Sequence, residues 1–165
     1  MKLRELAGDL LVALKQDAGD WAVVVAFSEL ANETLRTQAE SYFLSKVSGL
    51  PDLSKISALS LFETWKTHIP SATFEALLAA RDHEVRMSLV QQFLAARAAY
   101  PVTEQRAHFK SLFVVKPFEA RQDTMRAYLR LSANDRKDLV GAFDKSICVS
   151  EQNTAVKKLC DEISK

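Results

Sequence analysis

Residues 82–94 read DHEVRMSLVQQFL, and this stretch decides the fold class of the chain. Arg86 is followed by an aromatic residue seven positions later, Phe93, and by an aliphatic residue eight positions later, Leu94. With about 100° per residue on an α-helix, both positions lie within roughly a quarter turn of the arginine. The stretch therefore predicts a helix with one apolar stripe and an arginine at the border of that stripe.

The same spacing occurs in three other stretches of the chain. They are Arg36/Phe43/Leu44, Arg106/Phe113/Val114 and Arg121/Tyr128/Leu129. A helix of one design that recurs along a chain is typical of stacked helical repeats. The low content of glycine and proline, four residues of each, also favours long helices joined by few turns.

The composition is that of one globular, all-α domain spanning residues 1–165. Hydrophobic residues make up 48% and charged residues 26% of the chain, which is long enough to bury a core. The formal net charge is +1, and only residues 81–137, with 11 basic and 6 acidic side chains, are mildly basic. The total charge thus predicts neither a strong nucleic-acid binder nor a membrane-surface protein.

The expected location is cytoplasmic and the expected state soluble, without a membrane partner. The apolar runs are far shorter than the roughly 20 residues of a membrane span, and charges interrupt the N-terminus before a signal peptide could form. Cys148 and Cys160 are the only cysteines. Two cysteines without zinc-ligand spacing do not make a disulfide framework, so we expect two buried thiols.

Apolar periodicity and boundary residues predict a succession of helices. The expected helices cover residues 2–17, 21–30, 35–47, 53–68, 71–81, 83–99, 103–115, 117–131, 132–148 and 151–164. Ser132 and Asp135 resemble a capping box, and Ser150 is expected to cap the last helix. From residue 71 the helices form three pairs whose second members begin near 83, 117 and 150, a period typical of helix-pair solenoids.

Here the chain resembles the HEAT-like repeats, whose second helix opens with an acid in the turn, a Val-Arg pair and an apolar stripe. The best match consists of Asp82, Val85, Arg86, Val90, Phe93 and Leu94. The match at 32–43 has Glu40 where the stripe calls for an apolar residue, the match at 117–129 lacks the acid, and the last pair lacks the arginine. The resemblance implies antiparallel helix pairs stacked as a short solenoid; the alternative is an irregular multi-helix bundle.

The sequence predicts no catalytic residue, metal site or cofactor. It contains no GxGxxG, GxxxxGK[ST], GxSxG or HExxH pattern, and His83-Glu84 shares only its first two letters with the last of these. Glu104 and His108, one helical turn apart, are expected to form a surface pair. An active site assembled from residues distant in the sequence stays open as an alternative.

The recurring arginines have a structural and a functional interpretation. In the first, the stem packs beside the apolar stripe and the guanidinium reaches a carbonyl or carboxylate of the next repeat; in the second, the arginines bind phosphate. We favour the structural role for Arg36, Arg86 and Arg121, because a phosphate contact would face water. The candidates for a partner surface are the basic residues off the stripe, expected to cluster near Ser132. They are Lys116, Arg126, Arg130, Arg136 and Lys137.

The expected function is a non-enzymatic protein–protein interaction module or adaptor built on stacked helix pairs. The alternative is a nucleic-acid-associated helical-repeat protein that uses the basic surface of residues 81–137. HEAT-like folds include DNA-alkylation repair enzymes, but this chain is shorter and shows no convincing catalytic constellation. A hydrolase or lyase with scattered residues is a third, weaker hypothesis. Acidic residues interrupt the basic segment, so a protein partner ranks first.

Overall fold

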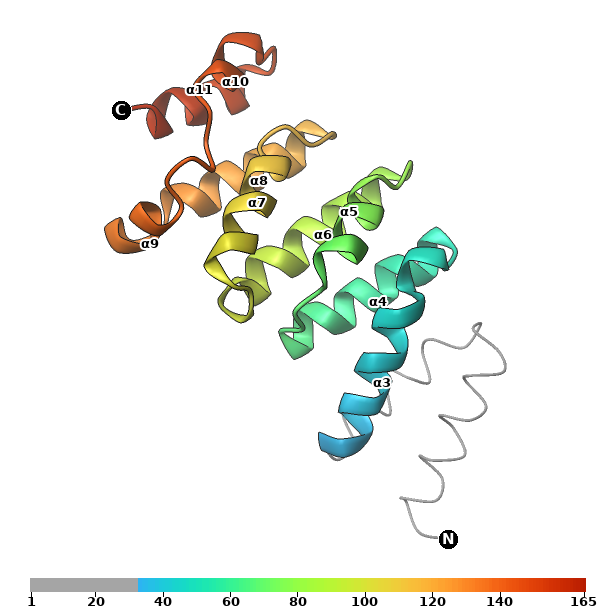
Figure 1. Cartoon of the computed structure of the whole chain (residues 1–165). Helices are drawn as coiled ribbons and strands as arrows, with labels where there is room; N and C mark the ends of the chain where they lie inside the picture. The colour runs from blue at the N-terminus through green and yellow to red at the C-terminus, as the bar shows by residue number, and fades with distance from the viewer. Residues whose placement is uncertain (1–32) are drawn as a thin grey trace, which may run out of the picture.

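The computed structural model describes residues 33–165, and this part of the chain is all-helical (Figure 1). It contains nine α-helices and two short 3-10 helices, and no strand lies within it. The helices expected at 2–17 and 21–30 lie outside the described residues. In chain order the elements are α3 (Glu33–Lys46), η1 (Val47–Gly49), α4 (Asp52–Trp65), α5 (Ser71–Leu78), α6 (His83–Ala96), η2 (Arg97–Ala99), α7 (Val102–Leu112), α8 (Phe118–Leu129), α9 (Ala133–Asp138), α10 (Ser146–Ser150) and α11 (Thr154–Ile163).

The helices follow one another along the molecule in their order in the sequence (Figure 1). Helix α6 packs against both α4 and α8, and α8 packs in turn against α11. The row α4, α6, α8 and α11 thus runs through the described part of the molecule. We call these four the second helices, because each is the later member of a helix pair.

The second helices repeat the same burial pattern. They begin at Asp52, His83, Phe118 and Thr154, at intervals of 31, 35 and 36 residues. The seventh residue of each helix has no exposed surface; these residues are Ala58, Leu89, Thr124 and Cys160. The eleventh residue is aromatic and buried in the first three; these residues are Phe62, Phe93 and Tyr128. One face of every second helix is therefore turned to a common core.

Aromatic side chains join the neighbouring helices into that core. The ring of Phe93 in α6 meets the rings of Phe74 in α5 and Phe109 in α7 edge to face, with centroids 5.8 and 5.3 Å apart. Phe113 meets Phe143 at 5.1 Å in the same geometry and extends the core toward the C-terminal segment. Such pairs stabilise a core beyond the area they bury.

Prolines and short polar side chains set the helix starts. Pro51, Pro70, Pro101 and Pro117 immediately precede α4, α5, α7 and α8. Asp82 caps α6 by accepting a hydrogen bond of 2.7 Å from the Glu84 N–H. The expected cap at Ser132 is confirmed, since its hydroxyl oxygen accepts from the Asp135 N–H at 3.1 Å.

The prediction of one helix over residues 132–148 is wrong. Helix α9 ends at Asp138, and α10 begins only at Ser146. Between them Gly141 adopts a φ of +84°, a left-handed conformation that ends helical geometry and that glycine adopts without steric cost. The predicted cap of the last helix is also wrong: the Asn153 side chain accepts from the N–H groups at the start of α11, whereas the Ser150 hydroxyl donates to the Ile147 carbonyl.

The expectation of two separate buried thiols is wrong as well. Cys148 and Cys160 form a disulfide that links α10 to α11. Spacing alone did not show this pairing, because the two residues meet only when α11 turns back along α10. Within residues 33–165 no helix is both long and apolar enough to cross a membrane.

Candidate functional site

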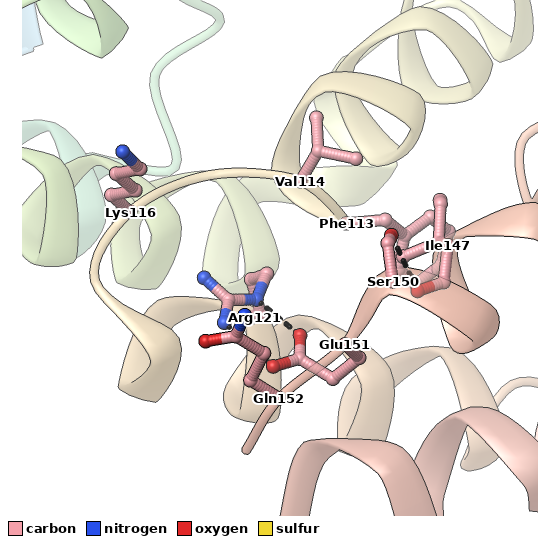
Figure 2. Close-up of a pocket in the computed structure, with 8 residues that line it drawn as sticks. All are labelled: Phe113, Val114, Lys116, Arg121, Ile147, Ser150, Glu151 and Gln152. Atoms are coloured by element: carbon pink, nitrogen blue, oxygen red, sulfur yellow. Dashed lines mark hydrogen bonds and ion pairs between the residues drawn. The ribbon is translucent and has the colours of Figure 1, made fainter.

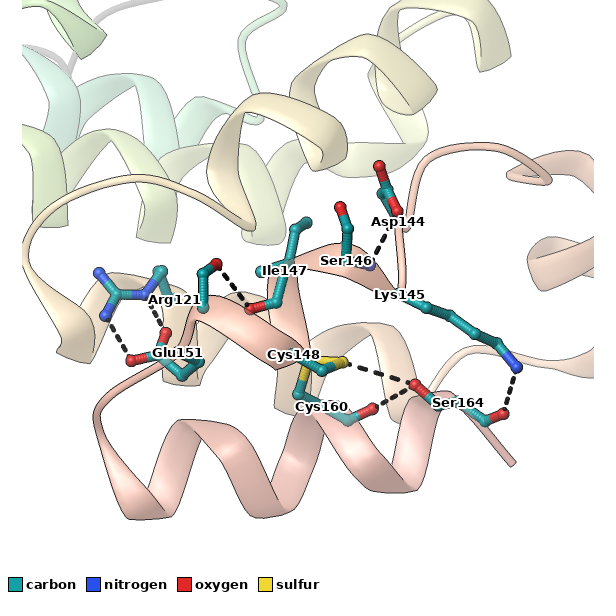
Figure 3. Close-up of a disulfide and its surroundings, with 10 residues drawn as sticks. Arg121, Asp144, Lys145, Ser146, Ile147, Cys148, Glu151, Cys160 and Ser164 are labelled. Carbon is teal, nitrogen blue, oxygen red and sulfur yellow. Dashed lines mark hydrogen bonds and ion pairs between the residues drawn. A yellow bond between two sulfur atoms is a disulfide. The ribbon is translucent and has the colours of Figure 1, made fainter.

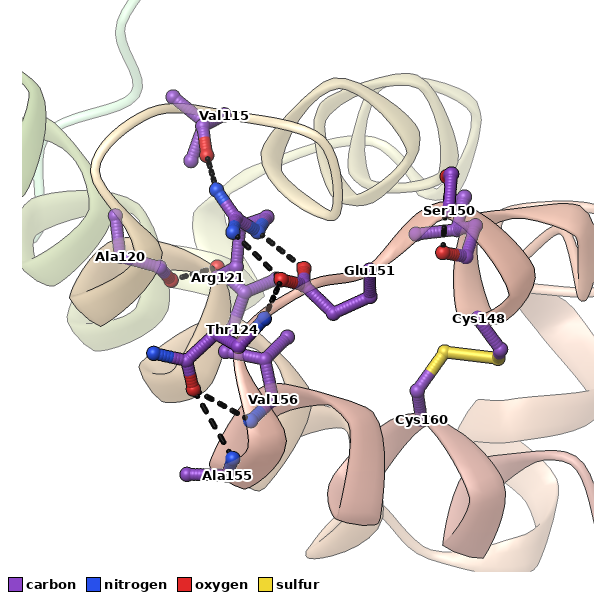
Figure 4. A network of polar contacts seen from close by, with 12 residues as sticks. Val115, Ala120, Arg121, Thr124, Cys148, Ser150, Glu151, Ala155, Val156 and Cys160 are labelled. Carbon is purple, nitrogen blue, oxygen red and sulfur yellow. Dashed lines mark hydrogen bonds and ion pairs between the residues drawn. A yellow bond between two sulfur atoms is a disulfide. The ribbon is translucent and has the colours of Figure 1, made fainter.

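Arg86 and Arg121, each the fourth residue of a second helix, make equivalent contacts. Arg86 donates hydrogen bonds to the carbonyl of Ala80, six residues earlier, and to the carbonyl of Lys116, thirty residues later. Arg121 donates to the carbonyl of Val115, again six residues earlier, at 2.9 Å. It also binds the Glu151 carboxylate, thirty residues later, with two bonds of 2.8 and 3.0 Å (Figure 4). Each arginine therefore ties the loop of its own helix pair to the loop of the next pair.

These contacts confirm the structural role predicted for two of the recurring arginines, Arg86 and Arg121. Arg36, by contrast, lies exposed near the start of α3. Arg106 belongs to a first helix of a pair, α7, and donates to the carbonyl of Asp138 at 2.6 Å. The sequence pattern thus occurs on two kinds of helix, and it marks the loop-bridging arginine only on the second helices.

Two open grooves flank the loop between α7 and α8. The first has a volume of about 400 Å³ and is lined mainly by Leu78, Ala79, Ala80, Arg86, Val114 and Lys116. The second has a volume of about 340 Å³ and is lined mainly by Val114, Lys116, Arg121, Ile147, Ser150 and Glu151 (Figure 2). Val114 and Lys116 belong to both grooves, and Arg86 and Arg121 occupy equivalent positions in them. The grooves are therefore the same feature in successive helix pairs.

Exposed apolar side chains recur at intervals of 35 residues, and Val114, which lines both grooves, is one of them. Val114 is 58% exposed, and Val149, at the equivalent position 35 residues later, is 86% exposed. Ala79, which lies 35 residues before Val114, is exposed too. Exposed apolar side chains beside a groove are typical of a surface that another molecule covers.

The charges of the two grooves differ. Burial alone would raise the pKa of Glu151, but the hydrogen bonds from Arg121 and from the Asn153 N–H hold that pKa below its usual value. The Arg121 guanidinium is thus neutralised by an ionised carboxylate. The Lys116 ammonium, which both grooves share, has no ion-pair partner among the described residues. A ligand of the second groove would meet the positive charge of Lys116, whereas a ligand of the first groove would also meet Arg86, whose guanidinium binds only carbonyl oxygens.

The five basic residues predicted as a partner surface lie in two separate places. Lys116 precedes α8, whereas Arg130 lies at the opposite end of that helix, roughly 18 Å away at 1.5 Å per residue. Arg130, Arg136 and Lys137 are all exposed around Ser132. Arg126 is exposed on α8, where its guanidinium lies 3.6 Å from the Asp123 carboxylate. The expected single cluster therefore does not include Lys116.

A partly buried cluster of His68, Glu104 and His108, which no sequence motif predicted, lies between α5, α6 and α7. Nε2 of His68 and Nε2 of His108 lie 2.8 and 4.0 Å from the same carboxylate oxygen of Glu104. His108 is 1% exposed and stacks on Phe74 with ring centroids 3.7 Å apart. Neither ring nitrogen of His108 has a hydrogen-bond partner within the described part of the chain. The expected surface pair of Glu104 and His108 is therefore wrong, because the histidine belongs to the core.

Burial controls the ionisation of His108 and of the neighbouring Tyr100. It lowers the pKa of His108 to about 4 and raises the pKa of Tyr100 to about 12, so both are neutral near pH 7. The Tyr100 hydroxyl donates to Oε1 of Gln92 at 2.9 Å and accepts from the Ile69 N–H at 3.2 Å. These bonds hold the loop between α4 and α5 against α6. The i, i+4 spacing of Glu104 and His108 was the only signal of the cluster in the sequence.

The described residues contain no group of three or more His, Cys, Asp or Glu side chains placed to hold a metal ion. No protein-family model, curated protein sequence or solved structure matches the chain. The two grooves and the exposed side chains around them are therefore the features that indicate a function.

Proposed function

We propose that the chain is a non-enzymatic interaction module, built as a short HEAT-like helical repeat, that binds another protein along the edge formed by the two grooves. The observation that carries the proposal is the exposure of Val114, which lines both grooves, together with that of Val149 at the equivalent position 35 residues later. Apolar side chains flanked by polar and charged groups are typical of a protein-binding surface.

The HEAT-like assignment is supported by the equivalent contacts of Arg86 and Arg121. Each bridges the residue six positions before it and the residue thirty positions after it. An irregular bundle has no reason to repeat these offsets, whereas a solenoid brings each repeat against the next in one geometry. The row of second helices, each packed on its neighbour, fits the same architecture.

The grooves also indicate what the partner contributes. The partner should contribute apolar side chains that pack against Val114 and its neighbours. It should also contribute a carboxylate that pairs with Lys116. A charged pair at the rim of an interface contributes mainly to orientation and association rate, so the apolar contact supplies most of the affinity.

Substitution of two exposed valines tests the proposal. Val114→Glu places a charge between the grooves, whereas Val140→Glu places the same charge on a valine that is 68% exposed in the loop after α9. Both proteins are immobilised beside the wild type, exposed to a lysate and treated with nuclease before mass spectrometry. We expect a protein that the wild type and Val140→Glu retain and that Val114→Glu loses. Equal retention by all three proteins, or release by nuclease, contradicts the proposal.

Nucleic-acid binding is the second candidate, and the exposure of Arg130, Arg136 and Lys137 around one corner favours it. The cluster is small, so we expect no shift of duplex DNA in a gel at about 50 mM salt, where non-specific electrostatic binding is strong. A shift that is lost in the double variant Arg126→Glu/Arg130→Glu would instead assign this surface to nucleic acid.

A further inference from the structure

Helix α10, which forms one wall of the second groove, is held differently from the other first helices. It spans five residues, too few for a helix to be stable in isolation. Helices α5 and α7 are anchored by the fully buried rings of Phe74 and Phe109, which lie 35 residues apart. The residue 35 positions after Phe109 is Asp144, which is exposed and whose carboxylate accepts from the Ser146 N–H at 2.9 Å. Helix α10 thus lacks the aromatic anchor.

The disulfide lies where the preceding helix pairs have a second apolar side chain that packs in the core. Cys148 stands at the position that Phe113 and Leu78 hold in the preceding repeats, and it is bonded to the fully buried Cys160 of α11 (Figure 3). Around this bond Nζ of Lys145 donates to the Ser164 carbonyl at 2.8 Å, and the Ser164 hydroxyl lies 3.5 Å from the Cys148 sulfur. Ile147 is the apolar residue of α10 that packs against the core, and it is only partly buried. The covalent bond therefore adds a second attachment that the equivalent helices obtain from buried apolar side chains.

We propose that the Cys148–Cys160 disulfide is a redox latch that fixes the α10 wall of the second groove. That wall consists of Ile147, Ser150 and the adjoining Glu151. When the disulfide is reduced, α10 is no longer fixed to α11, so Ile147 and Ser150 lose their fixed place in this wall, while Glu151 stays paired with Arg121. The first groove contains no residue of α10 and keeps its shape. The consequence for binding rests on the proposed function; the structural latch does not.

The reductant is a dithiol. One of its thiolates attacks the sulfur of Cys148, which is 8% exposed, whereas Cys160 has no exposed surface. The S–S bond breaks, Cys160 leaves as a thiolate and takes up a proton, and a mixed disulfide forms at Cys148. The second thiol of the reductant then displaces Cys148 as a thiol and closes the reductant to its own disulfide. Two electrons and two protons pass to the protein.

Hydrogen exchange of the intact chain, with and without dithiothreitol, tests the latch. We expect the amides of residues 146–150 to exchange on the order of 100-fold faster after reduction, the factor that corresponds to the usual stabilisation by one disulfide. The amides of α5, the equivalent helix of the first groove, should not change. The double variant Cys148→Ser/Cys160→Ser should exchange rapidly at 146–150 with or without dithiothreitol, because the chain has no other cysteine.

Equal protection of residues 146–150 before and after reduction overturns the latch, as does an equal acceleration in α5, which would show a general loss of stability. Reoxidation of the wild type should restore protection, and this control does not depend on the folding of the variant.

If a Val114-dependent partner is captured, it should bind the oxidised protein at least about tenfold more tightly than the reduced protein. Equal capture by the oxidised and the reduced protein overturns the control of the groove by the disulfide. Absence of any such partner counts against the proposed function, while exchange alone still decides the latch.

Discussion

Arg121 and Arg126 lie on the same helix, but their surroundings differ. The Arg121 side chain is 16% exposed and is paired with the Glu151 side chain, which is 5% exposed. Arg121→Ala leaves that carboxylate buried without its partner, so we expect a loss of about 3 kcal/mol in the free energy of unfolding. Arg126 is 49% exposed, and Arg126→Ala should cost no more than about 0.5 kcal/mol. Urea titration compares the two variants; equal losses would contradict the structural role of Arg121.

The sequence showed that Arg86 and Arg121 border an apolar stripe, because that position follows from helical spacing alone. It did not show which groups they bind. The Glu151 carboxylate and the Lys116 carbonyl lie thirty residues after the arginines that they bind, and their placement depends on how one helix pair packs on the next. The burial of His108 escaped prediction for the same reason, since α5 supplies the ring on which it stacks.

His108 should make the stability of the fold depend on pH. In the unfolded chain the imidazole takes up a proton below about pH 6.5, whereas burial lowers its pKa in the fold to about 4. Between these values the unfolded state binds more protons, so stability falls as the pH falls. The loss should be about 2 kcal/mol between pH 7 and pH 5. Urea titrations at pH 7, 6 and 5 measure it.

A matched pair of variants isolates this effect. His108→Leu should lose most of the pH dependence, whereas His83→Leu, which replaces an exposed histidine, should keep it. Two other titratable groups face the site, His68 and Glu104, and both remain in each variant. The lowered pKa of Glu104, due first to its hydrogen bond with His68, removes stability only below its usual value near 4.5, outside the measured range. An unchanged dependence in His108→Leu would show that His108 is not its source.

At the scale of single elements, the helix starts next to prolines were predicted from the sequence to within one or two residues. Helices α4, α5, α7 and α8 all begin directly after a proline, where the missing N–H has no helical partner to lose. Residues 132–148 do not form one helix, although Leu139, Phe143 and Ile147 have helical spacing. Only the backbone shows that Gly141 interrupts it.

Alanine substitutions at Gly141 and Gly49 distinguish the cost of a left-handed backbone conformation from the cost of steric overlap. A methyl group added at Gly141 or Gly49 would meet no atom within 4 Å, but only Gly141 has a positive φ, +84°. Gly141→Ala should therefore destabilise the protein by about 1–2 kcal/mol, the cost of a left-handed conformation for a residue with a Cβ atom. Gly49→Ala should be neutral or slightly stabilising. Thermal unfolding of both variants checks this; a loss in Gly49→Ala as large as in Gly141→Ala would contradict the backbone explanation.

At the scale of the whole molecule, the sequence indicated helix pairs with intervals of 34 and 33 residues between second helices. The corresponding helices, α6, α8 and α11, begin 35 and 36 residues apart. This interval could be predicted from the sequence because each of these helices buries an apolar stripe with the same spacing. The two grooves could not be predicted from the sequence, because each is formed by residues from successive helix pairs and no continuous motif marks them.

Because Phe93 joins α5, α6 and α7 in one core, the helix pairs should unfold together. The far-ultraviolet circular dichroism of the chain should be helical, with a single thermal transition. Phe93→Ala should cost about 3–5 kcal/mol and move this transition to lower temperature without splitting it. Leu53→Ala, which truncates a side chain that is 81% exposed, should change the stability by no more than about 0.5 kcal/mol. A Phe93→Ala protein with two transitions, one of them at the wild-type temperature, would show that the helix pairs on either side of α6 fold independently.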